Sequence, residues 1–176
     1  YFEGERTPLH DPDARGAILG LRLRHTRGDV YRALLESVGY GIRHNIEAMR
    51  EEGARAQRIL AVGGGTGNEL WLQMVSDIAG VEMEVPEQTI GASYGDAFLA
   101  GIGTGLVSGM EEIGRWVRTK ETIRPVAGRR AVYDRGYRVF RGLYEGTKDL
   151  MKDAEEAGRG GASAVADRRA FHRRGR

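Results

Sequence analysis

The chain contains no cysteine among its 176 residues. Disulfide bonds, thiolate zinc sites, iron–sulfur clusters and a cysteine nucleophile are therefore excluded within it. Long apolar runs are also missing, since no stretch approaches the roughly 18–20 residues that a membrane-spanning helix needs. The chain begins with Tyr1 rather than Met, and no signal-peptide pattern follows. We therefore expect one globular domain of a cytoplasmic protein, cut from a longer chain.

A strong excess of charge of one sign is absent from most of the chain. The formal net charge is +2, but residues 152–176 carry seven basic and four acidic side chains, so residues 1–151 have a net charge of −1. This body shows no basic stripe with interleaved aromatic residues, which argues against nucleic acid as a partner. We expect residues 152–176 to form a basic, disordered tail.

Apolar periodicity predicts a mostly helical body with little sheet. Helices are expected at residues 26–53, 68–79, 91–104 and 134–151, with a short one after Ser108. Strands are expected at residues 59–62 and 82–85, and residues 119–132 are expected to be irregular. Because two strands do not form an independent sheet, we expect the sheet to continue in residues upstream of Tyr1.

The stretch with the most chemical information is residues 62–68, Val-Gly-Gly-Gly-Thr-Gly-Asn. A strand, a glycine-rich turn and a helix N-terminus follow one another there. Glycines let a ligand lie against the main chain, and the unpaired amides and dipole of a helix N-terminus attract anions. We predict a nucleotide site at Gly63, Gly64, Gly65 and Asn68, in which Asn68 either caps the helix or contacts the base or sugar.

Three interpretations of this turn stay open from the residues alone. The turn lacks the Gly-Lys-Ser/Thr ending of a Walker A loop. It is either another kind of nucleotide-binding loop, or the first motif of an S-adenosylmethionine-dependent methyltransferase, or a tight turn without a ligand. The spacing to Glu82 and Glu84 is similar to that of a ribose-binding acid. A methyltransferase, however, needs further strands after Val85, where the pattern predicts only helices.

Five segments carry a more specific resemblance because of their order. They are residues 4–16, 16–36, 63–77, 86–101 and 125–144. They include Gly4-Glu5-Arg6-Thr7-Pro8, Gly63-Gly64-Gly65 with Asn68, Trp71, Gln73 and Asp77, and Gly95-Asp96-Ala97. In this order they resemble the FGGY carbohydrate kinases, ATP-dependent sugar kinases of the actin-like fold.

The resemblance implies an α/β, actin-like (ribonuclease H-like) ATPase C-terminal domain over residues 1–151, mostly helical in this fragment with a partial sheet. In that family the sugar and the catalytic Asp lie mainly on the N-terminal domain, whereas ATP lies mainly on the C-terminal domain, with Mg²⁺ bridging its phosphates. Gly64 and Asn68 look like the family's nucleotide contacts, with Gly63 and Gly65 in the loop around them. No position matches a catalytic base or a metal ligand, so we expect neither in this chain.

The resulting hypothesis is the ATP-binding C-terminal part of a sugar kinase, with a pentulose such as xylulose as the favoured substrate. The isolated chain is expected to be inactive, because the N-terminal kinase domain that supplies the catalytic Asp is a missing partner. A membrane is not expected as a partner, and a homodimer is considered. The alternatives are the methyltransferase and an inert actin-like fragment that acts only as a binding module.

Overall fold

The computed structural model describes the backbone of residues 1–173 and the side chains of residues 1–157. The chain divides into two compact units, one formed by Tyr1–His25 with Arg138–Arg176 and the other by Thr26–Tyr137.

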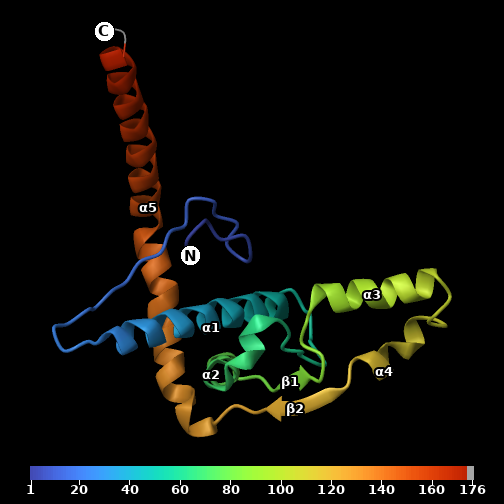
Figure 1. Ribbon diagram of the computed structural model, residues 1–176. Coiled ribbons are helices and arrows are strands. Elements are labelled where there is room, and N and C mark those ends of the chain that lie inside the picture. The colour runs from blue at the N-terminus through green and yellow to red at the C-terminus, as the bar shows by residue number, and fades with distance from the viewer. Residues whose placement is uncertain (174–176) are drawn as a thin grey trace. The chain divides into compact units, whose positions relative to one another are not determined.

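The described residues are mostly helical, as the periodicity predicts, and Figure 1 shows the elements in chain order. The helices are α1 (Arg27–Glu51), α2 (Glu69–Ala79), α3 (Ala92–Gly103), α4 (Ile113–Trp116) and α5 (Arg130–Arg173), with the 3-10 turns η1 (Gly64–Gly67), η2 (Met110–Glu112) and η3 (Ala127–Arg129). The strands are β1 (Met83–Pro86) and β2 (Thr119–Ile123), which pair antiparallel.

The start of α1 is fixed by the predicted capping box. The Thr26 hydroxyl accepts a hydrogen bond from the Asp29 amide at 3.3 Å, and the Asp29 carboxylate accepts one from the Thr26 amide at 2.7 Å. α1 then packs against α2 (Figure 1). Gly39 permits the close approach, because a Cβ there would lie 2.7 Å from Ile78 Cδ1. Local capping and a missing side chain together set how this helix pair docks.

One apolar cluster joins the helix pair to the strands. Its buried members are Leu72, Val75, Ala79, Val81, Met83 and Val85, with Ile42, Ile46, Ile59, Trp71 and Ile123 packed around them. Burying a Val or Leu side chain contributes about 1.5–3 kcal/mol, so this cluster holds β1 against α2 and thereby positions the segment between them.

The predicted strand at residues 59–62 is reduced to a single parallel bridge, between Leu60 and Glu84 of β1. The Ala61 amide donates to the Glu84 carbonyl and the Glu84 amide to the Ile59 carbonyl, each at 2.9 Å. Among the described residues, this bridge is the only pairing of the segment, and its other edge is unpaired. The bridge still directs the chain alongside β1 toward its carboxyl end.

The prediction that residues 119–132 are irregular is wrong for β2. The sequence Thr-Lys-Glu-Thr-Ile has three exposed positions followed by two half-buried ones, so it lacks the alternation that marks a strand. Its extended conformation comes from the ladder to β1, in which Met83 lies opposite Ile123 and Glu84 opposite Thr122. β-structure depends on the partner strand in this way more than helix does on its neighbours.

In the other unit, residues 1–25 form a loop fixed to α5. Glu5 and Asp11 exchange two backbone hydrogen bonds of 2.8 Å, and the Tyr144 hydroxyl donates to the Asp11 carboxylate at 2.7 Å. That bond is the main reason why the pKa of Asp11 is lowered. Burial, followed by the same bond, raises the pKa of Tyr144 to about 12. Arg15 pairs with Glu155 at 2.9 Å, so the loop is tied at a second point.

α5 begins at Arg130 and passes residue 151, where the predicted helix ends. The boundary expected between residues 151 and 152, and the disorder expected for residues 152–176, stay predictions. Residues 174–176 lie outside the described part of the chain, as do the side chains beyond residue 157.

Asp77 organises the connection that follows β2. Its carboxylate, with a side chain that is 0% exposed, pairs with Arg129 at 2.8 Å. It also accepts hydrogen bonds from the Val126 amide at 2.7 Å and from Gln73 Nε2 at 2.9 Å. Asp77, which belongs to one of the segments that resemble the family, therefore has a structural role here.

We expect Asp77→Ala to lower the free energy of unfolding by about 2–3 kcal/mol, because it leaves the Val126 amide without its buried acceptor. Urea unfolding followed by circular dichroism measures this. Asp96→Ala is the control, since Asp96 is exposed on α3, and we expect a change within about 0.5 kcal/mol. Equal effects of both variants would contradict the role assigned to Asp77.

Candidate functional site

The segment between residue 62 and α2 is the predicted glycine turn, residues 63–67. Gly63 has a φ of +91°, a conformation that favours glycine. Its amide donates to the Thr89 carbonyl at 2.6 Å, and its carbonyl accepts from the Thr66 amide at 3.1 Å and the Thr66 hydroxyl at 2.7 Å. The amides of Gly64 and Gly65 precede the Thr66 amide, which is the first in η1 to donate within the turn. Leading amides of this kind are the ones that a helical turn leaves for a ligand or for water.

The glycine turn has one open face and one packed face. A Cβ added at Gly63, Gly64 or Gly67 would meet no atom within 4 Å, whereas one added at Gly65 would overlap the ring of Trp71. The Trp71 indole Nε1 is buried and has no hydrogen-bond partner, so the ring acts as apolar support beneath the turn. The open face is the side on which a ligand can approach the main chain.

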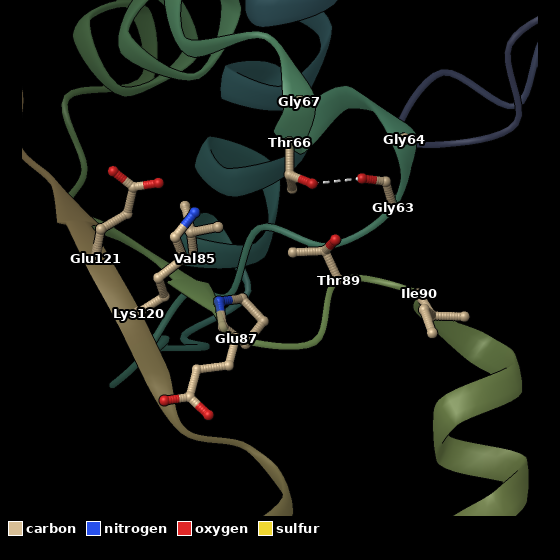
Figure 2. A pocket seen from close by; sticks show the side chains of 11 residues that line it. Gly63, Gly64, Thr66, Gly67, Val85, Glu87, Thr89, Ile90, Lys120 and Glu121 are labelled. Carbon is tan, nitrogen blue, oxygen red and sulfur yellow. Dashed lines mark hydrogen bonds between the residues drawn. The ribbon is translucent and has the colours of Figure 1, made fainter.

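A cavity of about 490 Å³ lies on this open face (Figure 2). It is lined by Gly63, Gly64, Thr66, Gly67, Val85, Pro86, Glu87, Thr89, Ile90, Lys120 and Glu121. These residues come from the glycine turn, from the end of β1 and the residues after it, and from β2. The carboxyl end of a strand in an open α/β sheet is the place where such folds bind ligands.

The structure brings only part of the predicted set to the cavity. Gly63 and Gly64 line it, whereas Gly65 and Asn68 are not among the lining residues. Gly65 packs on Trp71. Asn68 Oδ1 accepts the Trp71 amide at 3.1 Å and so caps α2, which is one of its two expected roles. The nucleotide contacts assigned to Gly63, Gly64, Gly65 and Asn68 stay predictions.

The two acidic residues with ribose-acid spacing are both engaged in ion pairs. Arg58 holds Glu84 with bonds of 2.9 and 2.7 Å, and Thr119 donates its hydroxyl to the same carboxylate. The hydrogen bonds from Arg58 and, to a smaller extent, from Thr119 lower the pKa of Glu84 to about 2. Glu82 pairs with Arg124 at 2.9 Å. Both carboxylates therefore serve to hold neighbouring segments together.

Several residues that line the cavity were not predicted from the sequence. Glu87, Thr89 and Ile90 follow Pro86 directly, and the signal that could have found them is their place at the carboxyl end of a predicted strand. Lys120 carries no such signal, because it belongs to the strand that the pattern misses. Among residues 1–157 there is also no group of three or more His, Asp or Glu side chains placed to hold a metal ion.

Comparison with known proteins gives a consistent result. A profile of the FGGY family of carbohydrate kinases, C-terminal domain, matches residues 1–104. A xylulose kinase of Staphylococcus epidermidis is 32% identical over 154 residues, which cover 87% of this chain and 31% of the relative. A glycerol kinase of Shewanella amazonensis is 40% identical over 113 residues, or 64% of this chain and 23% of the relative. The crystal structure of xylulose kinase from Rhodospirillum rubrum superposes with a TM-score of 0.72 at 36% identity, covering 86% of this chain and 30% of that one.

This chain belongs to the FGGY family of carbohydrate kinases. Its fold is therefore part of the actin-like ATPase fold, mostly helical with a small sheet, as the sequence predicts. Membership in the FGGY family decides against the methyltransferase alternative. The chain spans less than a third of the length of the kinases named above. No helix in its described part is long and apolar enough to cross a membrane.

We expect Gly65→Ala to destabilise this FGGY domain by about 1–3 kcal/mol, because the added methyl must displace the Trp71 ring. Thermal unfolding measures the change, and a shifted tryptophan emission reports the moved ring. Gly67→Ala is the matched control, since nothing lies within 4 Å of a Cβ there, and its melting temperature should stay close to that of the parent. A Gly65 variant as stable as the Gly67 variant would show that the turn is not packed on Trp71.

We expect Arg58→Met to raise the pKa of the Glu84 carboxyl from about 2 toward its ordinary value of 4.5. Because the folded-state pKa is lowered, the contribution of Glu84 to stability is present above pH 4.5 and is lost as the pH falls toward 2. The variant should lose that part of the acid dependence. A carboxyl-resolved NMR titration checks this, and an unchanged Glu84 midpoint would contradict the assignment to Arg58.

Proposed function

We propose that this chain supplies the ATP-binding, C-terminal part of a sugar kinase that phosphorylates a sugar hydroxyl. The observation that carries the proposal is the open face of the glycine turn, which borders a cavity of about 490 Å³ in a chain of the FGGY family. Family membership supports the reaction class, and the cavity supports the assignment of the nucleotide to this part of the kinase.

The residues present fit a nucleotide by their chemistry. The leading amide of Gly64, which lines the cavity, offers a donor to an anion, and the amino terminus of α2 adds partial positive charge beside it. Gly63 and Gly64 leave room for a phosphate or ribose against the main chain, because no atom lies within 4 Å of an added Cβ. Bound ATP would supply the transferable γ-phosphate, with Mg²⁺ neutralising its phosphate oxygens.

A pentulose, with xylulose favoured, is the proposed substrate. Alignment length does not separate the two substrates, because the glycerol kinase of Haemophilus influenzae aligns with 88% of this chain and the xylulose kinase of Staphylococcus epidermidis with 87%. The solved structures support the pentulose, since the xylulose kinase from Rhodospirillum rubrum superposes with a TM-score of 0.72 at 36% identity and the Plasmodium falciparum glycerol kinase with 0.62 at 21%. We place the protein in the cytoplasm, as expected for a sugar kinase, with a homodimer as the oligomer to test.

The isolated chain is proposed to bind ATP without turning it over. It spans 31% of the length of the Staphylococcus epidermidis xylulose kinase, and none of its residues resembles the family's catalytic Asp. The N-terminal kinase domain is therefore the proposed partner that brings the sugar and the base. In such kinases closure of two domains aligns the hydroxyl with the γ-phosphorus and excludes water.

Calorimetric titration of the purified chain tests the nucleotide part of the proposal. We expect saturable binding of ATP and ADP, and no phosphorylation of xylulose in a coupled assay. Gly64→Val should abolish binding without lowering the melting temperature, because its side chain fills the cavity and clashes with nothing nearby. Gly142→Val on α5 is the control and should bind normally.

Two results would contradict the proposal. Turnover of xylulose and ATP by the chain alone would show that the catalytic base is present after all. The absence of ATP and ADP binding would favour the remaining alternative, an actin-like fragment that acts only as a binding module.

A further inference from the structure

The ladder between β1 and β2 contains an irregularity at Lys120. Val85 lies opposite Glu121, but the next residue, Pro86, lies opposite Thr119, so Lys120 has no partner on β1. Pro86 has no amide hydrogen to donate to a ladder, which explains why regular pairing fails at this point. Lys120 is the extra residue of a β-bulge.

A bulge re-aims the side chain of its extra residue, and bulges are frequent beside binding sites. Lys120 lines the cavity, and in Figure 2 its side chain extends from β2 toward the glycine turn. The preceding residue, Thr119, donates its hydroxyl to Glu84 instead. The bulge thus separates a side chain that ties the sheet together from one that faces the cavity.

Lys120 has no structural task that would account for this placement. No ion pair joins its ammonium group to a carboxylate of residues 1–157. Lys148, which lies outside the cavity, does form an ion pair, with Glu145 at 2.8 Å. Lys120 is also exposed to solvent rather than packed in the core. Its charge is therefore available to a ligand.

The charges of the cavity show what Lys120 contributes. It is the one cationic residue in the lining, which also contains the acidic residues Glu87 and Glu121. Their negative charges alone would disfavour an anion in the cavity, even though the Glu87 side chain extends away from the glycine turn (Figure 2). The ammonium group offsets one of these negative charges and adds a mobile donor across the cavity from those amides.

We propose that Lys120 binds a phosphate group of the nucleotide, opposite the glycine turn, and that the β-bulge places it there. The inference rests on the proposed function, since it specifies how the same cavity holds its nucleotide. Lys120 is assigned to phosphate rather than to base or sugar, because an ammonium group interacts with phosphate as a point charge without a strict geometry.

Calorimetric titrations with ATP, ADP and adenosine test this assignment. We expect Lys120→Met to weaken the binding of ATP and ADP by about 10-fold, the size of one charge-assisted hydrogen bond, and to leave adenosine binding unchanged. Lys120→Arg should stay within about 3-fold of the parent, because it keeps the charge. Glu121→Gln, which removes a negative charge from the lining, should tighten ATP binding.

Lys148→Met is the matched control, since it removes the same charge from a lysine on α5 outside the cavity. It should bind all three ligands as the parent does. Melting temperatures within about 2 °C of the parent establish that each variant is folded, because surface changes of this kind cost little.

Each outcome decides between the two proposals. If the parent binds neither ATP nor ADP, the proposed function fails and the inference falls with it. If the parent binds them and Lys120→Met binds them equally well, the role of Lys120 is refuted while the proposed function stands. A loss of adenosine binding as large as the loss of ATP binding also overturns the phosphate assignment, because it shows that Lys120 shapes the cavity rather than holding phosphate.

Discussion

The position of the glycine turn depends on contacts with β1, with Thr89 and with Trp71. The pairing of residues 59–61 with Glu84 brings the chain to the carboxyl end of β1, and the Gly63 amide is then anchored to the Thr89 carbonyl at 2.6 Å. Trp71 supports the turn from the packed side. With these three constraints satisfied, Gly63, Gly64, Thr66 and Gly67 line a cavity, while Gly65 packs on Trp71.

The glycine turn presents main chain rather than side chains to most of its side of the cavity. Asn68, which could in principle have contacted a base or sugar, uses its Oδ1 to cap α2. Glu84, which has the spacing of a ribose-binding acid, is held by Arg58. Glycine at positions 63 and 64 leaves this side of the turn free of side chains, so the main chain is accessible there.

The same sheet explains why the cavity has a charged wall. β1 buries Met83 and Val85 in the apolar cluster, while its last residue, Pro86, interrupts the ladder to β2. Packing energy therefore fixes the strand, and a missing amide hydrogen determines where the partner strand departs from regular register. The position of Lys120 in the cavity follows from these two properties of neighbouring residues in β1.

Features that act over a few residues could be predicted from the amino-acid sequence. The capping box at Thr26, the Asn68 cap and the left-handed Gly80 that ends α2 were all predictable, because each depends on a side chain and backbone groups within one helical turn. Gly63 and Gly64 were also identified from local pattern. By contrast, the packing of Gly65 on Trp71 and the strand at residues 119–123 became evident in the folded chain alone. The strand depends on pairing with β1, which is distant along the chain, and the contact of Gly65 depends on how the turn folds back onto α2. No local pattern of polar and apolar residues encodes either arrangement.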